Sequence, residues 1–182
     1  MKKKSLAILS LPKAASTTSS PVRKTVTKAT PMKARTSPSK GRAKAAPASG
    51  AQLLKGKKNA TYLAGLKVRS EVLGKAYVEQ RIAEADVFTA DLQHFVNEHA
   101  WGAVWTRPGL SRKIRSLLVL AMTTAMNRPH ELEIHVRGAL NNGVTMDEMK
   151  ELFLQAAVYA GAPAALDGFR VAKKVLKEQG KL

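Results

Sequence analysis

The chain has 182 residues and a formal net charge of +18, and that charge is unevenly distributed. Residues 1–58 contain 12 Lys, 3 Arg and no acidic residue, whereas the rest of the chain contains 16 basic and 13 acidic residues. The absence of Cys excludes disulfides, thiolate metal sites and Cys nucleophiles, and no apolar run approaches the roughly 18 residues of a membrane-spanning helix. We therefore expect a basic tail over residues 1–58 and one small domain from Tyr62 to Gln179.

The tail is dominated by Ser, Thr, Pro, Ala and Lys. Its regularly spaced prolines interrupt helices, and its apolar content is too low to offset the entropy of ordering, so a disordered, solvated extension is predicted. Two alternatives stay open. The lysines are also typical of an arm that binds polyanions weakly and without sequence preference, and an acid-free, Ser-rich segment is typical of an organellar transit peptide.

The first residues, Met1 to Leu11, imitate a secretory signal. Their apolar stretch is short, however, and no small-residue cleavage site follows it. We therefore expect a cytoplasmic protein with no membrane partner.

Helical periodicity dominates the chain after the tail. A first helix is predicted over residues 62–85, in two pieces because glycines interrupt it. A second is predicted to begin at Asp86 and to end near Trp101 and Gly102. The Pro-Gly pair within residues 103–109 then indicates a loop.

Further helices are indicated by their end signals. Ser111 is a good N-cap for a helix to about Met126, and a short helix from His130 to about Asn141 ends at an Asn-Gly pair. Thr145 and Glu148 form a capping box that opens a helix to about Ala160, and Pro163 opens the last helix. No window alternates with a period of two residues, so we predict an all-α domain of about six helices.

The densest polar cluster of the predicted domain contains Glu131 and His135. These residues are four apart, so they share one helix face within hydrogen-bonding reach, beside the apolar face of Leu132 and Val136. A carboxylate that orients and charges an imidazole makes a general acid or base near neutral pH. The alternative is an ordinary surface pair.

A metal site built from His130, Glu131 and His135 is a further alternative. Three residues on one short helix do not converge on a metal without help, and no second cluster of Cys or His supports them. We expect no metal.

A second cluster gathers cations at a predicted helix start. Arg107, Arg112 and Arg115 lie around the first turn, where the helix dipole disfavours positive charge. Exposed amides and guanidinium groups both favour carboxylates, so the cluster indicates an anion site. Solvated surface, or ion pairs to other helices, are the alternatives.

Several separated stretches, in order, resemble the carboxymuconolactone decarboxylase family of the alkylhydroperoxidase-like superfamily. They are GLKVRSEVLG, GAVWTRPGLSRKIRSLLVLAM, NRPHELEIHVRGALNNGVT and ELFLQAAVYAGAPAALDGFRVAKKVL, which together span essentially the whole predicted domain. Superfamily members that reduce peroxides carry paired Cys at the positions of Arg128 and Glu131, with a His at that of His135. The chain lacks the thiols, so the resemblance places it in the decarboxylase branch.

The resemblance implies an all-helical, ring-like homo-oligomer, a hexamer or trimer, that uses no metal or organic cofactor. It also implies a reaction of protocatechuate breakdown by the β-ketoadipate route, in which 4-carboxymuconolactone loses CO2 to give 3-oxoadipate enol-lactone. Two alternatives are an enzyme of the same fold acting on another small acid or lactone, and an oligomeric binding or stress protein that uses its tail on polyanions.

For the site, we hypothesise that His135, supported by Glu131, donates a proton to carbon. His130 or Asn127 then donates a hydrogen bond to the lactone oxygen. The groups expected to hold or enclose the substrate are the cations Arg107, Arg112 and Arg115 and the aromatic residues Trp101, Trp105 and Tyr159. The two Trp residues can equally pack in the core or at an interface.

Overall fold

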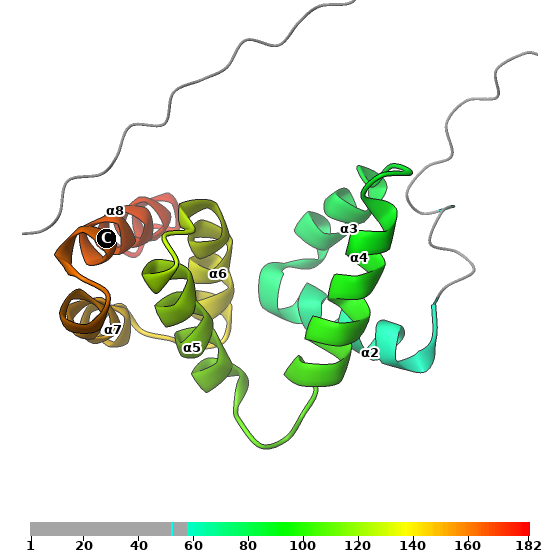
Figure 1. The fold of residues 1–182 in the computed structure, drawn as a ribbon, viewed down its shortest axis with the longest axis horizontal. Helices are drawn as coiled ribbons and strands as arrows, with labels where there is room; N and C mark the ends of the chain where they lie inside the picture. Colours follow the sequence, from blue (N-terminus) through cyan, green and yellow to red (C-terminus); the bar gives the residue numbers. More distant parts are fainter. Residues whose placement is uncertain (1–51, 53–57) are drawn as a thin grey trace, which may run out of the picture. The chain divides into compact units, whose positions relative to one another are not determined.

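The computed structural model of the chain describes Gln52 and residues 58–182. Residues 58–182 form seven α-helices and one π-helix, without a strand, which confirms the predicted all-α class (Figure 1). The tail predicted over residues 1–58 lies outside the described residues, apart from Gln52 and Lys58. The elements are α2 (Ala60–Leu73), α3 (Lys75–Ala83), α4 (Ala90–Phe95), the π-helix η1 (Val96–Trp105), α5 (Arg112–Ala125), α6 (Pro129–Asn141), α7 (Met146–Tyr159) and α8 (Ala162–Glu178).

Side-chain caps fix where several of these helices begin. The Asn59 side chain accepts a hydrogen bond from the Tyr62 amide at 2.8 Å, and Ser111 accepts one from the Ile114 amide at 3.3 Å. Thr145 and Glu148 form the predicted capping box, with each side chain bonded to the other residue's amide. Each cap satisfies an amide that the first turn leaves unpaired. The predicted starts of α5 and α7 are confirmed.

The segment between Asp86 and Gly109 differs from its prediction. The Asp86 carboxylate accepts hydrogen bonds from the amides of Phe88 and Thr89, which closes a turn and delays α4 to Ala90. α4 then continues into η1 as far as Trp105, so the predicted loop over residues 103–109 begins three residues too early. Periodicity did not reveal the π-helix, in which both Trp101 and Trp105 are buried.

Helices α5 to α8 lie side by side and share one apolar core (Figure 1). This core is built around the buried side chains of Leu120, Leu132, Val136, Phe153 and Val175. A second cluster joins α2 to η1 and contains Val68, Val72, Trp101 and Trp105. α6 contacts both α2 and α5, so it stands between the two clusters.

Two glycines allow α2 and η1 to pack closely. A Cβ atom on Gly65 would collide with the Asn97 carbonyl oxygen, and one on Gly102 would collide with the Thr61 carbonyl oxygen. Only glycine permits backbones to approach this closely. The crossing fixes how the side chains of η1 face those of α2.

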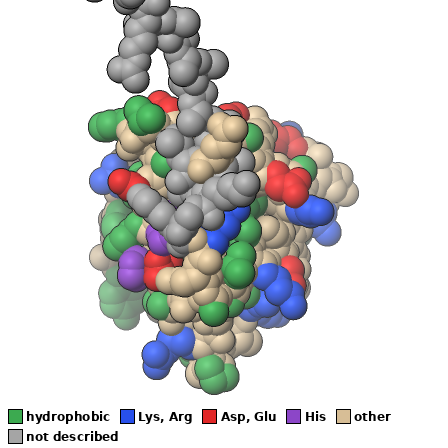
Figure 2. Space-filling view, turned by 90° about the vertical axis from the view of Figure 1, so that its right-hand side faces the viewer, with side chains coloured by type: hydrophobic (Ala, Val, Ile, Leu, Met, Phe, Trp, Pro, Cys, Tyr) green, Lys and Arg blue, Asp and Glu red, His purple; other side chains and the backbone are tan. Residues whose placement is uncertain are grey.

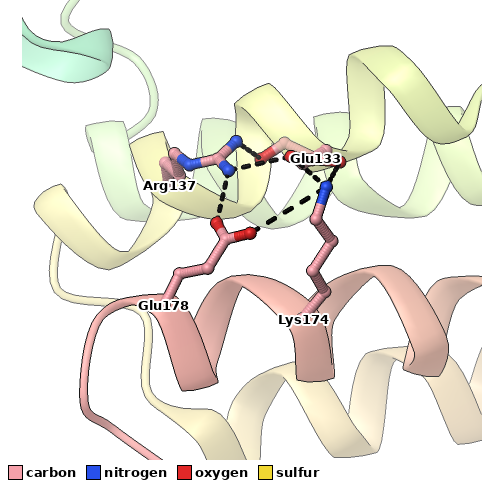
Figure 3. Close-up of polar contacts among 4 residues, drawn as sticks. All are labelled: Glu133, Arg137, Lys174 and Glu178. Carbon is pink, nitrogen blue, oxygen red and sulfur yellow. Dashed lines mark hydrogen bonds and ion pairs between the residues drawn. The ribbon is translucent and has the colours of Figure 1, made fainter.

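A four-residue ion-pair network ties α6 to α8 (Figure 3). Arg137 lies 2.8 Å from Glu133 and 2.6 Å from Glu178, while Lys174 lies 3.0 Å from Glu133. Hydrogen bonds from Arg137 and Lys174 lower the pKa of Glu133, because they favour its charged form. The network holds the helix that also carries Glu131 and His135.

The visible surface mixes charges of both signs with apolar side chains (Figure 2). This is the surface expected of residues 59–182, whose basic and acidic residues nearly balance. Among the described residues, no helix combines the length and the apolar character that crossing a bilayer requires.

Candidate active site

His135 lies where α6 meets η1, stacked on an aromatic pair. The imidazole is nearly parallel to the Trp101 indole, with ring centroids 6.4 Å apart and planes 14° apart. Trp101 in turn stacks on Trp105 at 4.6 Å, and the two indoles are 4% and 9% exposed. The structure therefore brings two of the three predicted aromatic residues, Trp101 and Trp105, together with His135, and both also belong to a buried apolar cluster.

Burial keeps the His135 imidazole neutral in the free protein. It lowers the pKa of His135 to about 4; the charge of Glu131 raises this pKa and the charge of Arg69 lowers it. Glu131 is exposed, and within the described part of the chain the two side chains share no hydrogen bond. The expectation that Glu131 charges the imidazole near neutral pH is wrong for the free protein, because desolvation outweighs the attraction.

Arg69 is a buried cation that sequence reasoning missed. The residue is 6% exposed, and its guanidinium donates through Nη1 to Gln93 Oε1 at 3.0 Å and to Asn97 Oδ1 at 3.1 Å. A signal existed, because Gly65, Arg69 and Val72 recur with helical spacing on the buried face of α2. A charge on such a face needs a structural or functional reason.

The predicted arginine cluster is only partly available for an anion. Arg112 forms an ion pair with Glu71 at 2.7 Å, and the neighbouring Lys113 forms one with Glu148 at 2.7 Å. The half-buried Arg115 donates through Nη2 to the Arg107 carbonyl oxygen at 3.0 Å. Ion pairs to other helices, the alternative that the sequence left open, describe Arg112 better than an anion site does.

Asn127, His130 and Glu131 lie together around the connection from α5 to α6. Asn127 has a φ of 53° in the left-handed region, and all three side chains are exposed. His130 and Glu131 belong to the first turn of α6, which begins with Pro129. Glu131 is four residues before His135 and shares its face of α6, whereas His130 is five residues before it and lies about 140° further round the helix.

Tyr159 lies elsewhere in the fold. It is 84% exposed at the end of α7 and lines a hollow of about 1180 Å³ between α5 and α7. His135, Trp101 and Trp105 do not line this hollow. Within one chain the structure does not bring Tyr159 to the Trp101–His135 pair.

Metal-binding side chains do not gather in the described residues. No group of three or more His, Asp or Glu side chains is placed there to hold one ion. His130, Glu131 and His135 thus do not converge as a ligand set.

Comparison with known proteins places these observations in a family. Residues 90–174 match the carboxymuconolactone decarboxylase family. A 4-carboxymuconolactone decarboxylase of Acinetobacter baylyi is 45% identical over 119 residues, which cover 65% of this chain and 89% of that protein. A nitrosuccinic acid decarboxylase of Metarhizium robertsii is 46% identical over 114 residues, which cover 63% of this chain and 80% of that protein.

The fold and candidate site are those of an all-helical protein whose site residues are aromatic, cationic and imidazole groups without a thiol. The chain belongs to the carboxymuconolactone decarboxylase family. The resemblance seen in the sequence is confirmed, and both relatives with a named activity are decarboxylases.

Proposed function

We propose that this protein is a carboxy-lyase that converts 4-carboxymuconolactone to 3-oxoadipate enol-lactone and CO2, a step of protocatechuate breakdown. The observation that carries the proposal is the half-buried His135, stacked on Trp101 beside the cation Arg69, in a chain 45% identical to a protein named for this activity. These groups suit a small anionic substrate that must gain one proton.

The chemistry sets three requirements. Loss of CO2 leaves an electron pair that spreads through the conjugated C=C and C=O bonds of the ring to the lactone carbonyl oxygen as a dienolate. The protein must therefore hold the substrate, place hydrogen-bond donors where the oxyanion develops, and deliver a proton to carbon. We propose that the chain's own residues meet all three and that no metal or organic cofactor takes part.

We propose His135 as the proton donor and Glu131 as its supporting carboxylate. The free imidazole is neutral, so it must gain a proton as the substrate binds. A bound dianion favours the protonated form, because opposite charge raises the pKa of an imidazole. Glu131 acts in the same direction. The proton that reaches carbon is thus taken up in the complex.

The remaining roles fall to groups near the two ends of α6: Asn127 and His130 adjoin its start, whereas Arg115 precedes Ser116, which accepts a hydrogen bond from Asn142 at its end. His130 or Asn127 donates to the lactone oxygen, and Trp101 and Trp105 wall the pocket. We retain Arg107 and Arg115 as anion-holding groups, while Arg112 can join them only by leaving Glu71. Tyr159 can wall a pocket only in an assembly that brings the end of α7 from one chain to the His135 face of another.

We also propose that the protein is a cytoplasmic homo-oligomer, a hexamer or trimer. Large apolar side chains are exposed along α5 and α7, where they surround the 1180 Å³ hollow. They include Ile114, Leu118, Leu154 and Val158. Contiguous apolar surface of this kind is typical of protein–protein contacts, and small Ala-rich helical domains commonly complete their core in this way.

A second candidate substrate is nitrosuccinic acid, because a relative at 46% identity is named for its decarboxylation. It is also a small dicarboxylic acid whose departing CO2 leaves electrons on a neighbouring acceptor, here a nitro group. The same site chemistry serves both molecules. The two substrates therefore differ in the shape that the site must accept and not in the type of reaction.

The experiment that separates the candidates is a direct comparison of kcat/KM for freshly generated 4-carboxymuconolactone and for nitrosuccinate. We expect the lactone to be preferred by at least about 100-fold, a margin typical of a site built for one substrate's polar groups. A preference for nitrosuccinate would transfer the assignment to the second candidate. Turnover of neither by folded protein would overturn both.

A further inference from the structure

The guanidinium of Arg69 is buried without a carboxylate partner. Its residue is 6% exposed, and among the described residues Arg69 forms no ion pair. Residues 1–58 contain no Asp or Glu, so every acidic side chain of the sequence lies in the described part. A buried cation without a counter-ion is costly, which makes this position unusual.

The groups around Arg69 are neutral or positively charged. The side-chain amide oxygens of Gln93 and Asn97 accept hydrogen bonds from Arg69 Nη1. Tyr62, Tyr77 and Arg81 are the titratable neighbours that act on its pKa, and burial is the largest effect, lowering that pKa. None of these neighbouring groups neutralises the positive charge of Arg69, although the two side-chain amides orient its guanidinium.

Three buried polar atoms in this cluster have no hydrogen-bond partner among the residues that the structure describes. They are Arg69 Nε, Asn97 Nδ2 and the Tyr62 hydroxyl. Only one other such atom, Arg115 Nε, occurs in the described side chains. Buried donors are nearly always paired in folded proteins, so several on one cationic cluster indicate a site for an acceptor. A carboxylate would neutralise the guanidinium charge, and its two oxygens would accept hydrogen bonds from the unpaired donors.

The cluster adjoins the proposed proton donor. The charge of Arg69 acts on the His135 imidazole, and Asn97 lies on η1 one turn before Trp101, on which that imidazole stacks. The crossing of α2 and η1 at Gly65 and Gly102 holds Arg69 against Asn97. The cation is thus positioned by the same contacts that position the aromatic pair.

We propose that Arg69, with Asn97 as a second donor, binds the carboxylate that the substrate keeps through the reaction. The identity of the substrate rests on the function proposed above. The retained carboxylate fits better than the departing one. A strong ion pair to the departing group would stabilise the ground state more than the transition state, in which that charge moves away.

The test uses a ligand that cannot lose CO2. Muconolactone is the proposed substrate with hydrogen in place of the ring carboxylate, and it keeps the acetate arm. Its affinity and that of its methyl ester are measured by calorimetry on the full-length chain. We expect the wild-type protein to bind the carboxylate about 10- to 100-fold more tightly than the ester, the range for a charge-assisted hydrogen-bond pair.

Arg69→Met should bind carboxylate and ester equally, and Arg170→Met should keep the wild-type preference. Arg170 is the matched control because it is an exposed arginine on α8 that forms an ion pair with Asp167. Arg69→Met should also fold, since it removes the desolvation cost of a buried charge that has no carboxylate partner. A preserved preference in Arg69→Met would overturn the proposal.

Asn97→Asp tests the same idea without removing the arginine. It supplies the carboxylate that the guanidinium lacks, so we expect a higher melting temperature together with loss of the preference for muconolactone over its ester. Unchanged affinity for muconolactone in this variant would contradict the assignment.

The two proposals fail separately. If the wild-type protein does not turn over the lactone, yet Arg69→Met abolishes a measured carboxylate preference, the proposed function fails and the binding role of Arg69 stands. If turnover is present and Arg69→Met retains the preference, the function stands and the role of Arg69 is wrong. A wild-type protein without any preference also overturns that role.

Discussion

The imidazole of His135 lies almost parallel to the indole of Trp101, with 14° between the ring planes and 6.4 Å between their centroids. The indole covers the imidazole and is itself 4% exposed, which places the titrating ring at the edge of the core. This contact joins the helix that carries the proposed proton donor to the helix that meets Arg69. The activity should therefore depend on the packing of α2, η1 and α6.

Replacing His135 with Gln should lower turnover of the lactone by about 100-fold or more, in line with general acid contributions. Glutamine keeps a hydrogen-bonding side chain but cannot deliver the proton. His99→Gln is the matched control, because His99 is an exposed histidine whose ring contacts Phe95 on the same helical run. A near-normal rate in folded His135→Gln would remove His135 from the mechanism.

The pH dependence of stability should report the buried imidazole. The pKa of His135 is about 4 when folded against 6.5 for the unperturbed group, so between these values the unfolded state binds more protons. Stability should therefore rise with pH from about 4 to 6.5 and fall on acidification, by up to about 3 kcal/mol before allowance for the partial exposure of the ring.

Two measurements check this pH effect. The His135 NMR signals, assigned with His135→Gln, should titrate near pH 4. The difference in unfolding free energy between the wild-type protein and His135→Gln should change over the same interval, since effects of Glu133 and other carboxylates cancel in the difference. A midpoint near 6.5 would show that the ring is solvated.

The close crossing of α2 and η1 should tolerate no added methyl group. Gly102→Ala should lower the free energy of unfolding by about 1–3 kcal/mol, the usual cost of overpacking, and should reduce turnover because Trp101 shifts. Gly109→Ala is the control, as a Cβ there meets no atom within 4 Å. Equal stability of the two variants in chemical denaturation would contradict the packing described here.

The apolar surface of α5 and α7 should mediate assembly. Leu118 is 47% exposed on this surface. Leu118→Glu should reduce the mass measured by light scattering from that of an oligomer toward that of one chain, because a buried unpaired charge disfavours the contact. Leu118→Met should assemble normally. A wild-type protein that is already monomeric would refute the proposal.

Local chemistry made most of the fold predictable. Caps at Ser111 and Thr145, together with Pro163, mark where helices begin, since they satisfy or remove amides that the first turn leaves unpaired. The π-helix was missed because its number of residues per turn differs from that of the α-helix, and the prediction looked for the α-helical period.

The candidate site was predictable where residues share one helix, and less so where helices cross. Glu131 and His135 could be paired from their spacing alone. The low pKa of His135 and the role of Arg69 depend on contacts with η1 and α2, which are distant in sequence. The ion pair of Arg112 with Glu71 likewise joins two helices. The sequence does not reveal this contact, so Arg112 was predicted to be available for an anion.

The most direct test of the account is a progress curve on freshly generated 4-carboxymuconolactone with the full-length chain, with and without a chelator. CO2 release and the absorbance of the enol-lactone product are followed together. We predict one CO2 per lactone consumed, at the same rate with chelator, and a rate at least about 100-fold lower for His135→Gln. Folded, assembled protein that leaves the lactone intact, or activity that the chelator abolishes, would contradict it.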